Sequence, residues 1–300
     1  MKQKSDVEVL RGKLNWRLGE TFYELIKAPK TITSDEAIVL IHGGPGSCHL
    51  SYRPFCESLV STLPVLVYDQ IGSGFSSKVT RASKLTVADF VEELSLLRRK
   101  LGLKKLHLFS HSWGAAIATE FSVKFSKYVS SNIFFGPYFD TSDWIRDANT
   151  LLKTLPPIHQ KAVARSLKSN DFGTKEFEKA TDFFNKLYLR RKEVVFPERT
   201  AGNSLFGLDV YNALWGASEF VCTGKLKSYS VVTKLKKITQ PALFICGEFD
   251  EAVPSTVKKY CNLVTKAEFR IISGAAHCAH YEKPRELKTQ IIQHLKALKE

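Results

Sequence analysis

Apolar and polar positions follow two different periods along the first half of the chain. Residues 7–28 alternate between polar and apolar side chains, which predicts a group of antiparallel strands at the N-terminal end. From residue 37 to residue 136, short apolar runs alternate with segments of helical spacing. The clearest helix spans 86–101, with Thr86 and Asp89 as its expected cap and Gly102 after its last turn. This alternation predicts an α/β fold with a mostly parallel central sheet flanked by helices.

The pattern changes between residues 138 and 227, where no run typical of a buried strand occurs. Residues 174–189 instead carry Phe177, Thr181, Phe184 and Tyr188 at helical spacing. We therefore expect 138–227 to be a helical cap, inserted after the sixth strand of a core that comprises residues 1–137 and 228–300. The sheet resumes near residue 241, and a final helix is expected over 284–298.

Four expected strands are each followed by a polar or glycine-rich segment. These segments are HGGPG at 42–46, SHSWGA at 110–115, GEFD at 247–250 and SGAAH at 273–277. Open α/β sheets bind their ligands at the carboxyl ends of the strands. The four segments are therefore expected to meet at one edge of the sheet.

Ser112 stands in a strand–turn–helix context that is typical of a nucleophile elbow, with small residues two positions before and after it. Serine is a weak nucleophile and needs a hydrogen-bonded base, which His277 can supply. Asp250 would hold the imidazole in the required tautomer. The chain order Ser112, Asp250, His277 is the order used by α/β-hydrolases. Asp140, after the sixth strand, is the competing acid, and we favour Asp250.

Three segments together resemble the proline iminopeptidases of the α/β-hydrolase superfamily, a group that includes the tricorn-interacting aminopeptidases. They are HGGPG at 42–46, YDQIGSGFS at 68–76 and SWG at 112–114. The resemblance runs from about residue 36 to the C-terminal helix. Ser110 replaces the usual glycine of the elbow, and Ala115 replaces a glycine or serine. Both replacements are small, so the turn is still expected to form.

The resemblance implies an α/β-hydrolase fold with a helical cap and a serine exopeptidase activity. Such an enzyme releases an N-terminal residue, preferably proline, from short peptides through an acyl-enzyme. Its expected substrates are short peptides or aminoacyl amides with a free N-terminus. Residues 69–74 are expected to form a structural turn that organises the neighbouring loops.

The expected reaction needs donors for an oxyanion and a site for the substrate amine. The backbone amide of Trp113, the residue after the nucleophile, is one expected donor. The resemblance implies Gly44 as the second, with Gly43 as the alternative. It also implies that Glu219 and Glu251 hold the α-ammonium group. An exopeptidase must measure one residue from the amine to the scissile carbonyl, and paired carboxylates can do this.

The sequence is also compatible with two alternative functions. An amino-acid amidase, esterase or lactonase could use the same triad, and a slow-turnover ligand receptor of the hydrolase fold is a less favoured possibility. Epoxide hydrolysis and dehalogenation are disfavoured, because those relatives carry aspartate where Ser112 stands.

The composition of the chain indicates its class and its expected location in the cell. With 300 residues, 44% of them apolar, the chain can bury a large core. No stretch reaches 18 consecutive apolar residues, and residues 1–6 lack the apolar run of a secretory signal. The six cysteines form no C-x-x-C pair and fit a reducing cytoplasm, which is the expected location.

The net charge of +14 comes from dispersed lysines and arginines, without an RNA-binding signature. We expect a solvated basic surface and no nucleic-acid or membrane partner. The histidines lack the spacing of metal ligands, so no metal and no cofactor is expected. The sequence leaves the oligomeric state open.

Overall fold

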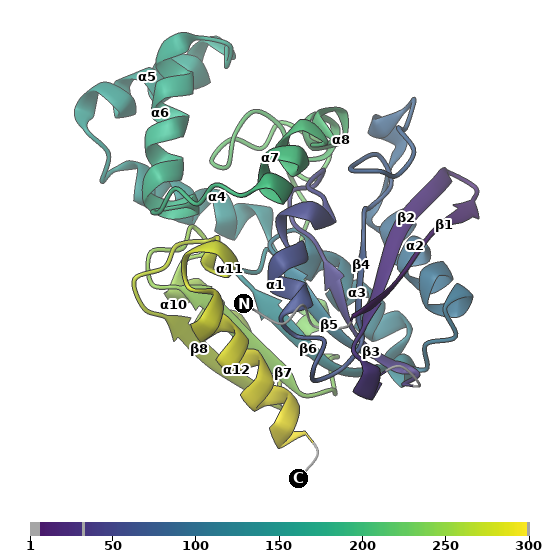
Figure 1. Ribbon diagram of the computed structural model, residues 1–300. Helices are drawn as coiled ribbons and strands as arrows, with labels where there is room; N and C mark the ends of the chain where they lie inside the picture. The colour runs from purple at the N-terminus through teal and green to yellow at the C-terminus, as the bar shows by residue number, and fades with distance from the viewer. Residues whose placement is uncertain (1–6, 32–33, 299–300) are drawn as a thin grey trace.

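A single mostly parallel sheet forms the centre of the molecule (Figure 1). The computed structural model describes residues 7–31 and 34–298, so the N-terminal residues 1–6 lie outside the described residues. Across the sheet the strands follow the order β1-β2-β4-β3-β5-β6-β7-β8. Their bounds are β1 (Glu8–Trp16), β2 (Gly19–Lys27), β3 (Glu36–Ile41), β4 (Val65–Tyr68), β5 (Lys105–His111), β6 (Val129–Phe135), β7 (Ala242–Gly247) and β8 (Ala267–Ile272).

Strand direction agrees with the prediction from the sequence. β1 pairs with β2 and β2 with β4 in antiparallel register. All other neighbouring pairs, from β4–β3 to β7–β8, are parallel. The expected antiparallel group at the N-terminal end and the expected α/β-hydrolase sheet are both confirmed. The carboxyl ends of β3, β5, β6, β7 and β8 therefore lie along one edge.

Helices cover both faces of this sheet (Figure 1). Those outside the inserted segment are α1 (Arg53–Glu57), α2 (Val87–Lys100), α3 (Gly114–Lys124), α9 (Val232–Leu235), α10 (Pro254–Cys261), α11 (Ala279–Glu282) and α12 (Pro284–Ala297). Side chains of β3 alternate between two hydrophobic clusters. Val39 and Ile41 pack with α2 and α3, while Ile38 and Leu40 pack with α1 and α12. Because successive side chains point to opposite faces and both faces are covered by helices, β3 is apolar throughout.

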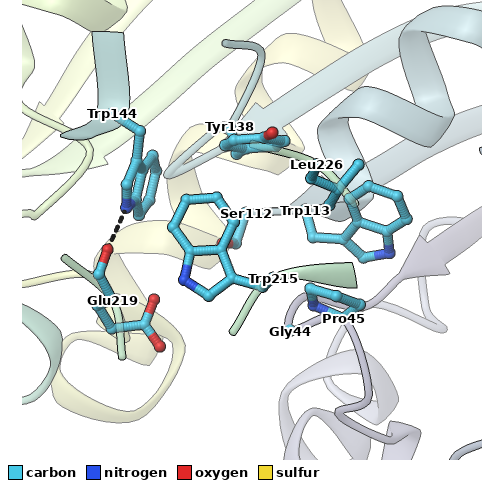
Figure 2. A pocket seen from close by; sticks show the side chains of 9 residues that line it. All are labelled: Gly44, Pro45, Ser112, Trp113, Tyr138, Trp144, Trp215, Glu219 and Leu226. Atoms are coloured by element: carbon cyan, nitrogen blue, oxygen red, sulfur yellow. Dashed lines mark hydrogen bonds between the residues drawn. The ribbon is translucent and has the colours of Figure 1, made fainter. Parts of the chain in front are cut away.

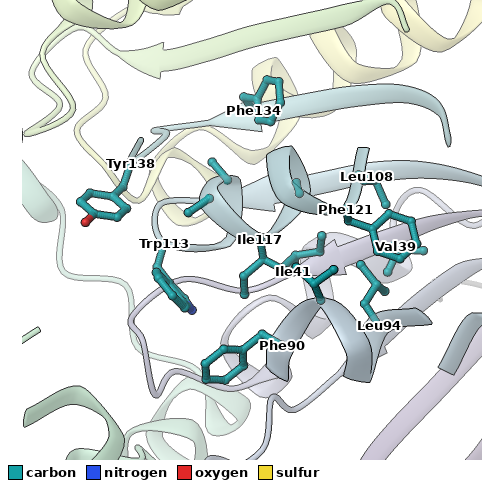
Figure 3. Packing of buried hydrophobic residues seen from close by; sticks show 14 of the residues in the cluster. Val39, Ile41, Phe90, Leu94, Leu108, Trp113, Ile117, Phe121, Phe134 and Tyr138 are labelled. Carbon is teal, nitrogen blue, oxygen red and sulfur yellow. The ribbon is translucent and has the colours of Figure 1, made fainter. Parts of the chain in front are cut away.

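The first cluster shows why α2 and α3 form helices against the sheet (Figure 3). Phe90 and Leu94, four residues apart on α2, are fully buried against Ile117 and Phe121 of α3. The backbone N–H of Thr86 donates to the Asp89 carboxylate at 2.7 Å, which satisfies an otherwise unpaired donor at the start of α2. The expected capped helix over 86–101 is thus confirmed.

Further helices lie between β6 and β7, and α5 and α6 extend away from the sheet (Figure 1). They are α4 (Thr141–Leu152), α5 (Pro157–Ser169), α6 (Lys175–Phe184), α7 (Pro197–Ser204) and α8 (Leu208–Leu214). The apolar faces of α4, α5 and α6 share a third cluster that includes Leu152, Phe177 and Phe184, whereas Val210 and Leu214 of α8 belong to the first cluster. The helix expected over 174–189 ends at Phe184 and continues as the π-helical turn η5 (Asn185–Leu189). The exact division of the chain into core and cap stays a prediction.

Among the described residues, no helix is both long and apolar enough to span a bilayer.

Candidate active site

Ser112 occupies a sharp turn between β5 and α3. Its φ of 52° lies in the left-handed region, as a nucleophile elbow requires. A Cβ at Gly114 would lie 2.1 Å from the carbonyl oxygen of Ile41, so only glycine lets α3 start this close to β3. The buried hydroxyl of Ser110, which replaces the usual glycine, donates to the carbonyl of Ile133 at 3.2 Å. The elbow therefore forms with its substituted residue.

His277, in the loop after β8, is paired with Asp250, in the loop after β7. The imidazole Nδ1 lies 2.6 Å from Asp250 Oδ1. The same carboxylate accepts the backbone N–H of Ala252 at 2.8 Å and that of Gly247 at 3.0 Å. These bonds fix Asp250 in place, and both side chains of the pair are buried. The arrangement orients the imidazole and leaves Nε2 free for proton transfer.

Asp140, the competing acid, has a different position. Its carboxylate accepts the backbone N–H of Asp143 at 2.8 Å and so caps the N-terminus of α4. In the structure Asp250 is therefore the carboxylate that contacts His277, and Asp140 caps a helix instead.

Ser112 and His277 line one cleft together with Gly44, Glu219 and Glu251. The cleft has a volume of about 220 Å³. The structure thus gathers these sequence-predicted residues, which come from the ends of several strands and from the inserted segment.

Gly136, at the end of β6, has a role that sequence reasoning missed. Its φ is 49°, and an added Cβ would lie 2.8 Å from the His277 ring and 3.2 Å from Asp250 Oδ2. A side chain at this position would displace the imidazole. The only feature of the sequence that could have indicated this role is the position of Gly136 directly after an expected strand.

The backbone amides of Gly44 and Trp113, the expected oxyanion donors, belong to residues that lie beside Ser112. Both residues line a narrow pocket with Ser112 (Figure 2). Neither amide donates a hydrogen bond to any described residue, so both are available to a ligand. Gly44 has a φ of 112°, and a Cβ there would lie 2.6 Å from the amide nitrogen of Gly46. Glycine is required at this position by the shape of the loop.

Gln70 connects the two segments that carry these amides. Its side-chain amide donates to the carbonyl of His42 at 2.8 Å, and its side-chain oxygen accepts the Trp113 indole N–H at 3.0 Å. His42 Nδ1 lies 3.0 Å from the carbonyl oxygen of Gly43. Burial lowers the pKa of His42 to about 4, so its ring is neutral and acts as a fixed hydrogen-bonding group. Residues 69–74 therefore organise the neighbouring loops, as expected.

His111 links the glycine loop to the base through a chain of hydrogen bonds. His111 Nε2 lies 3.0 Å from the His277 carbonyl oxygen, which can only accept, so Nε2 carries the proton. Burial lowers the pKa of His111 well below its usual value, which leaves the ring neutral and makes Nδ1 an acceptor. The Tyr52 hydroxyl donates to Nδ1 at 2.7 Å and accepts the Gly43 N–H at 3.4 Å. Sequence reasoning did not identify this role of His111.

Glu251 is a buried carboxyl group without a hydrogen-bond partner. Only 2% of the residue is exposed, and neither side-chain oxygen is hydrogen-bonded in the described part of the chain. One of these oxygens lies 3.8 Å from His277 Nε2. Burial, followed by repulsion from Glu219 and Asp250, raises the pKa of Glu251 well above its usual value. Such a group is suited to a cationic ligand that restores its charge.

Glu219 lies near Glu251 and reaches the same cleft. Its carboxylate accepts the Tyr211 hydroxyl at 3.2 Å, and its backbone carbonyl accepts the Trp144 indole N–H at 3.0 Å (Figure 2). Burial raises the pKa of Glu219, while His277 and Tyr211 oppose that shift. Two acidic groups with raised pKa values therefore lie beside the serine.

An apolar wall adjoins Ser112 and Glu219 (Figure 2). Tyr138, Trp144, Trp215, Leu226 and Pro45 line the narrow pocket around Ser112. The sequence alone could not identify which aromatic residues of the inserted segment line a pocket.

Known proteins share this architecture. A family model described as the alpha/beta hydrolase fold matches residues 36–284. A proline iminopeptidase of Heyndrickxia coagulans is 35% identical over 251 residues, which make up 83% of this chain and 86% of that relative. The chain belongs to the proline iminopeptidase family of α/β hydrolases. The resemblance inferred from the three sequence segments is therefore confirmed, and the protein is a hydrolase of the α/β fold.

Two further relatives extend this match over nearly the whole chain. A proline iminopeptidase of Lactobacillus helveticus is 28% identical over 284 residues, covering 93% of this chain and 95% of that one. The crystal structure of a Mycobacterium smegmatis proline iminopeptidase has a TM-score of 0.88 at 24% identity. The alignment covers 96% of this chain and 98% of that chain, and it shows that the fold is shared.

Proposed function

We propose that the protein is a serine exopeptidase that releases an N-terminal residue, preferably proline, from short peptides. Ser112 Oγ attacks the scissile carbonyl while His277 Nε2 takes its proton and Asp250 stabilises the resulting imidazolium. The amides of Gly44 and Trp113 stabilise the oxyanion. His277 then protonates the leaving amine, which leaves an acyl-enzyme. Water, deprotonated by His277, hydrolyses this ester and regenerates Ser112.

The observation that carries this proposal is the buried Glu251 carboxyl, which has no hydrogen-bond partner among the described residues and lines the cleft of Ser112 together with Glu219. A buried carboxylate without a donor is costly, and an α-ammonium group supplies the opposite charge and N–H donors, two of them in the case of an N-terminal proline. An amine held there leaves only the first residue between the glutamates and the serine. The site is thereby suited to removing one residue at a time.

The preference for proline is supported by the pocket and by the family. The pyrrolidine ring is compact and apolar, and the indole and phenol rings of Trp144, Trp215 and Tyr138 offer it an apolar wall. The names of the relatives from Heyndrickxia coagulans and Lactobacillus helveticus also favour proline. The cytoplasmic location expected from the sequence stays a prediction.

A panel of fluorogenic aminoacyl amides, each prepared with a free and with an acetylated amine, tests the proposal. Acetylation removes the charge that two glutamates bind, so kcat/KM is expected to fall by about 100-fold or more. Among the free amines, the prolyl substrate is expected to have the highest kcat/KM. Equal cleavage of free and acetylated substrates would reject an exopeptidase and favour a general amidase or esterase.

A further inference from the structure

The C-terminal end of η5 is hydrogen-bonded to the backbone of the candidate site. The carbonyl of Tyr188 accepts the backbone N–H of His277 at 3.1 Å and that of Glu251 at 3.3 Å. The carbonyl of Leu189 accepts the N–H of Cys278 at 3.0 Å. The next residue along the chain is therefore held at a fixed position relative to both the base and the amine site.

That next residue is Arg190, which starts a run of three basic side chains. The following two are also anchored, because the backbone N–H groups of Arg191 and Lys192 both donate to Glu282 Oε1, the latter at 2.9 Å. The Arg191 guanidinium lies 3.8 Å from the centroid of the Phe249 ring. The backbone of the basic run is thus fixed next to the site, and Arg190 of this run lines the cleft itself.

These residues line a separate hollow of about 360 Å³, which we call the basic cavity. Its lining side chains are Lys186, Arg190, Arg191, Lys192 and Arg199, together with Asp182, Asn185 and Glu193. None of the five basic side chains forms an ion pair with a residue that the structure describes. Five cations facing two carboxylates favour an anionic ligand.

Arg190 joins this cavity to the cleft of the candidate triad, because it lines both. The cleft therefore contains acidic groups for an amine and also a cation, Arg190, which lines the basic cavity as well and whose charge opposes the rise in the pKa of Glu219. A peptide whose amine lies on Glu219 and Glu251 and whose first side chain occupies the aromatic pocket must continue through the rest of the cleft. The rest of the cleft includes Arg190.

We propose that the basic cavity binds a carboxylate on the leaving side of the scissile bond. The carboxylate is either the C-terminus of a di- or tripeptide or an acidic side chain close after the first residue. This proposal rests on the proposed exopeptidase function and narrows its substrate class to short peptides with a negative leaving part. Arg190 supplies planar, paired donors that match a carboxylate.

Matched substrates isolate the contribution of this charge. Pro-Ala is compared with Pro-Ala amide to test the C-terminal carboxylate, and Pro-Asp amide with Pro-Asn amide to test an acidic side chain. At least one pair is expected to show about a 10-fold preference in kcat/KM for the charged member, the size of one charge-assisted hydrogen bond. The pair that responds identifies which carboxylate is bound.

Variants of Arg190 then test its location. Arg190→Gln is expected to bring the ratio within the responding pair close to one, and Arg190→Lys, which retains the charge, to preserve part of it. The ratio cancels any general effect of the variant on folding or on the amine site. Arg99→Gln is the control, because Arg99 is an exposed arginine on α2, away from the cleft, and should leave activity and ratio unchanged.

The outcomes separate this proposal from the proposed function. If the wild type cleaves free prolyl amides but neither pair shows a preference for charge, the basic cavity is not a carboxylate site and the exopeptidase function stands. A preference that persists in full in Arg190→Gln overturns the assignment to Arg190 and its cavity. If no free-amine prolyl substrate is cleaved, both proposals fail.

Discussion

Asp250 and Asp140 differ in their hydrogen-bond partners, and this difference predicts unequal effects of the same substitution. Asp250→Asn should lower kcat about 10⁴-fold, because an amide in place of the carboxylate favours the wrong imidazole tautomer. Asp140→Asn should have little effect, since asparagine caps a helix as well as aspartate does. Steady-state hydrolysis of a prolyl amide measures both variants, with Ser112→Ala as the inactive reference. A severe loss in Asp140→Asn with a mild one in Asp250→Asn would reverse the assignment.

Glu251 links activity to stability through its raised pKa. In the empty protein the folded state retains the Glu251 proton to a higher pH than the unfolded chain does. The stabilisation that this proton gives is therefore fully present at pH values below the pKa of Glu251 in the unfolded chain. It is lost as pH rises through the pKa in the folded protein. Glu251→Gln removes this loss, so its Tm should exceed that of the wild type increasingly as pH rises, by about 2 °C or more at neutral pH.

The same variant should lower kcat/KM for free-amine substrates by about 10- to 100-fold, because the neutral amide cannot pair with an ammonium group. Thermal denaturation without substrate at several pH values, together with the kinetics, measures both effects. Glu248→Gln is a matched control, since Glu248 binds the hydroxyl of Ser273 and the amide of Gly274 away from the cleft. A Glu251→Gln variant that is less stable at every pH, or fully active, would contradict this account.

At the scale of elements, Glu93 connects α2 to β2 and to the loop after β4. Its carboxyl accepts the Thr21 hydroxyl and the backbone N–H of Ile71, the latter at 2.9 Å. Burial raises the pKa of Glu93 to about 8. The folded protein thus binds a proton here that the unfolded chain has already lost, and the free energy of unfolding falls as pH rises from about 4.5 to about 8.

Glu93→Gln keeps the shape of the side chain and removes its titration. Urea unfolding between pH 5 and pH 9 should show a shallower decline in the variant than in the wild type. The difference in the free energy of unfolding should reach about 4 kcal/mol near pH 8, since each unit between the folded and unfolded pKa values is worth about 1.4 kcal/mol. Parallel curves for the two proteins would show that Glu93 does not titrate in this range.

The elements that the sequence predicted well are those whose burial is periodic. The helices α2 and α12 and the strands β3, β5, β6, β7 and β8 lie close to their expected positions, because each presents a regular apolar pattern to a nearby cluster. The predicted helix over 174–189 was too long. Its last turn changes to π geometry at Asn185, and the carbonyls of Tyr188 and Leu189 bind the site backbone. Local periodicity contains no information about such distant partners.

At the scale of the whole molecule, the candidate triad was predictable because its order and its place at strand ends follow from the fold. The contacts that support it were not predictable from local pattern. Gly136 is needed because the His277 ring approaches it, and the hydrogen-bond chain from Gly43 to His277 passes through Tyr52 and His111. These contacts join segments that are up to 234 residues apart in the sequence. They depend on how the loops pack after the sheet has formed.

Access to Ser112 is a property of the whole molecule, because residues inserted between β6 and β7 form much of the wall around it. Trp144, Trp215 and Glu219 line its narrow pocket, and only 8% of Ser112 is exposed. A substrate must therefore enter as a free chain end. Short peptides with N-terminal proline should be cleaved, and a folded protein whose N-terminal proline is packed should release proline at least about 100-fold more slowly, since its end must first unfold locally.

Amino-acid analysis of released proline measures this difference. The matched control is the same folded protein with a flexible tail of about ten glycine and serine residues placed between the proline and its first ordered residue. The tail should restore most of the rate seen with a free peptide, because it allows the end to reach the cleft while the rest of the protein stays folded. Equal release of proline with and without the tail would show that the inserted helices do not restrict access to Ser112.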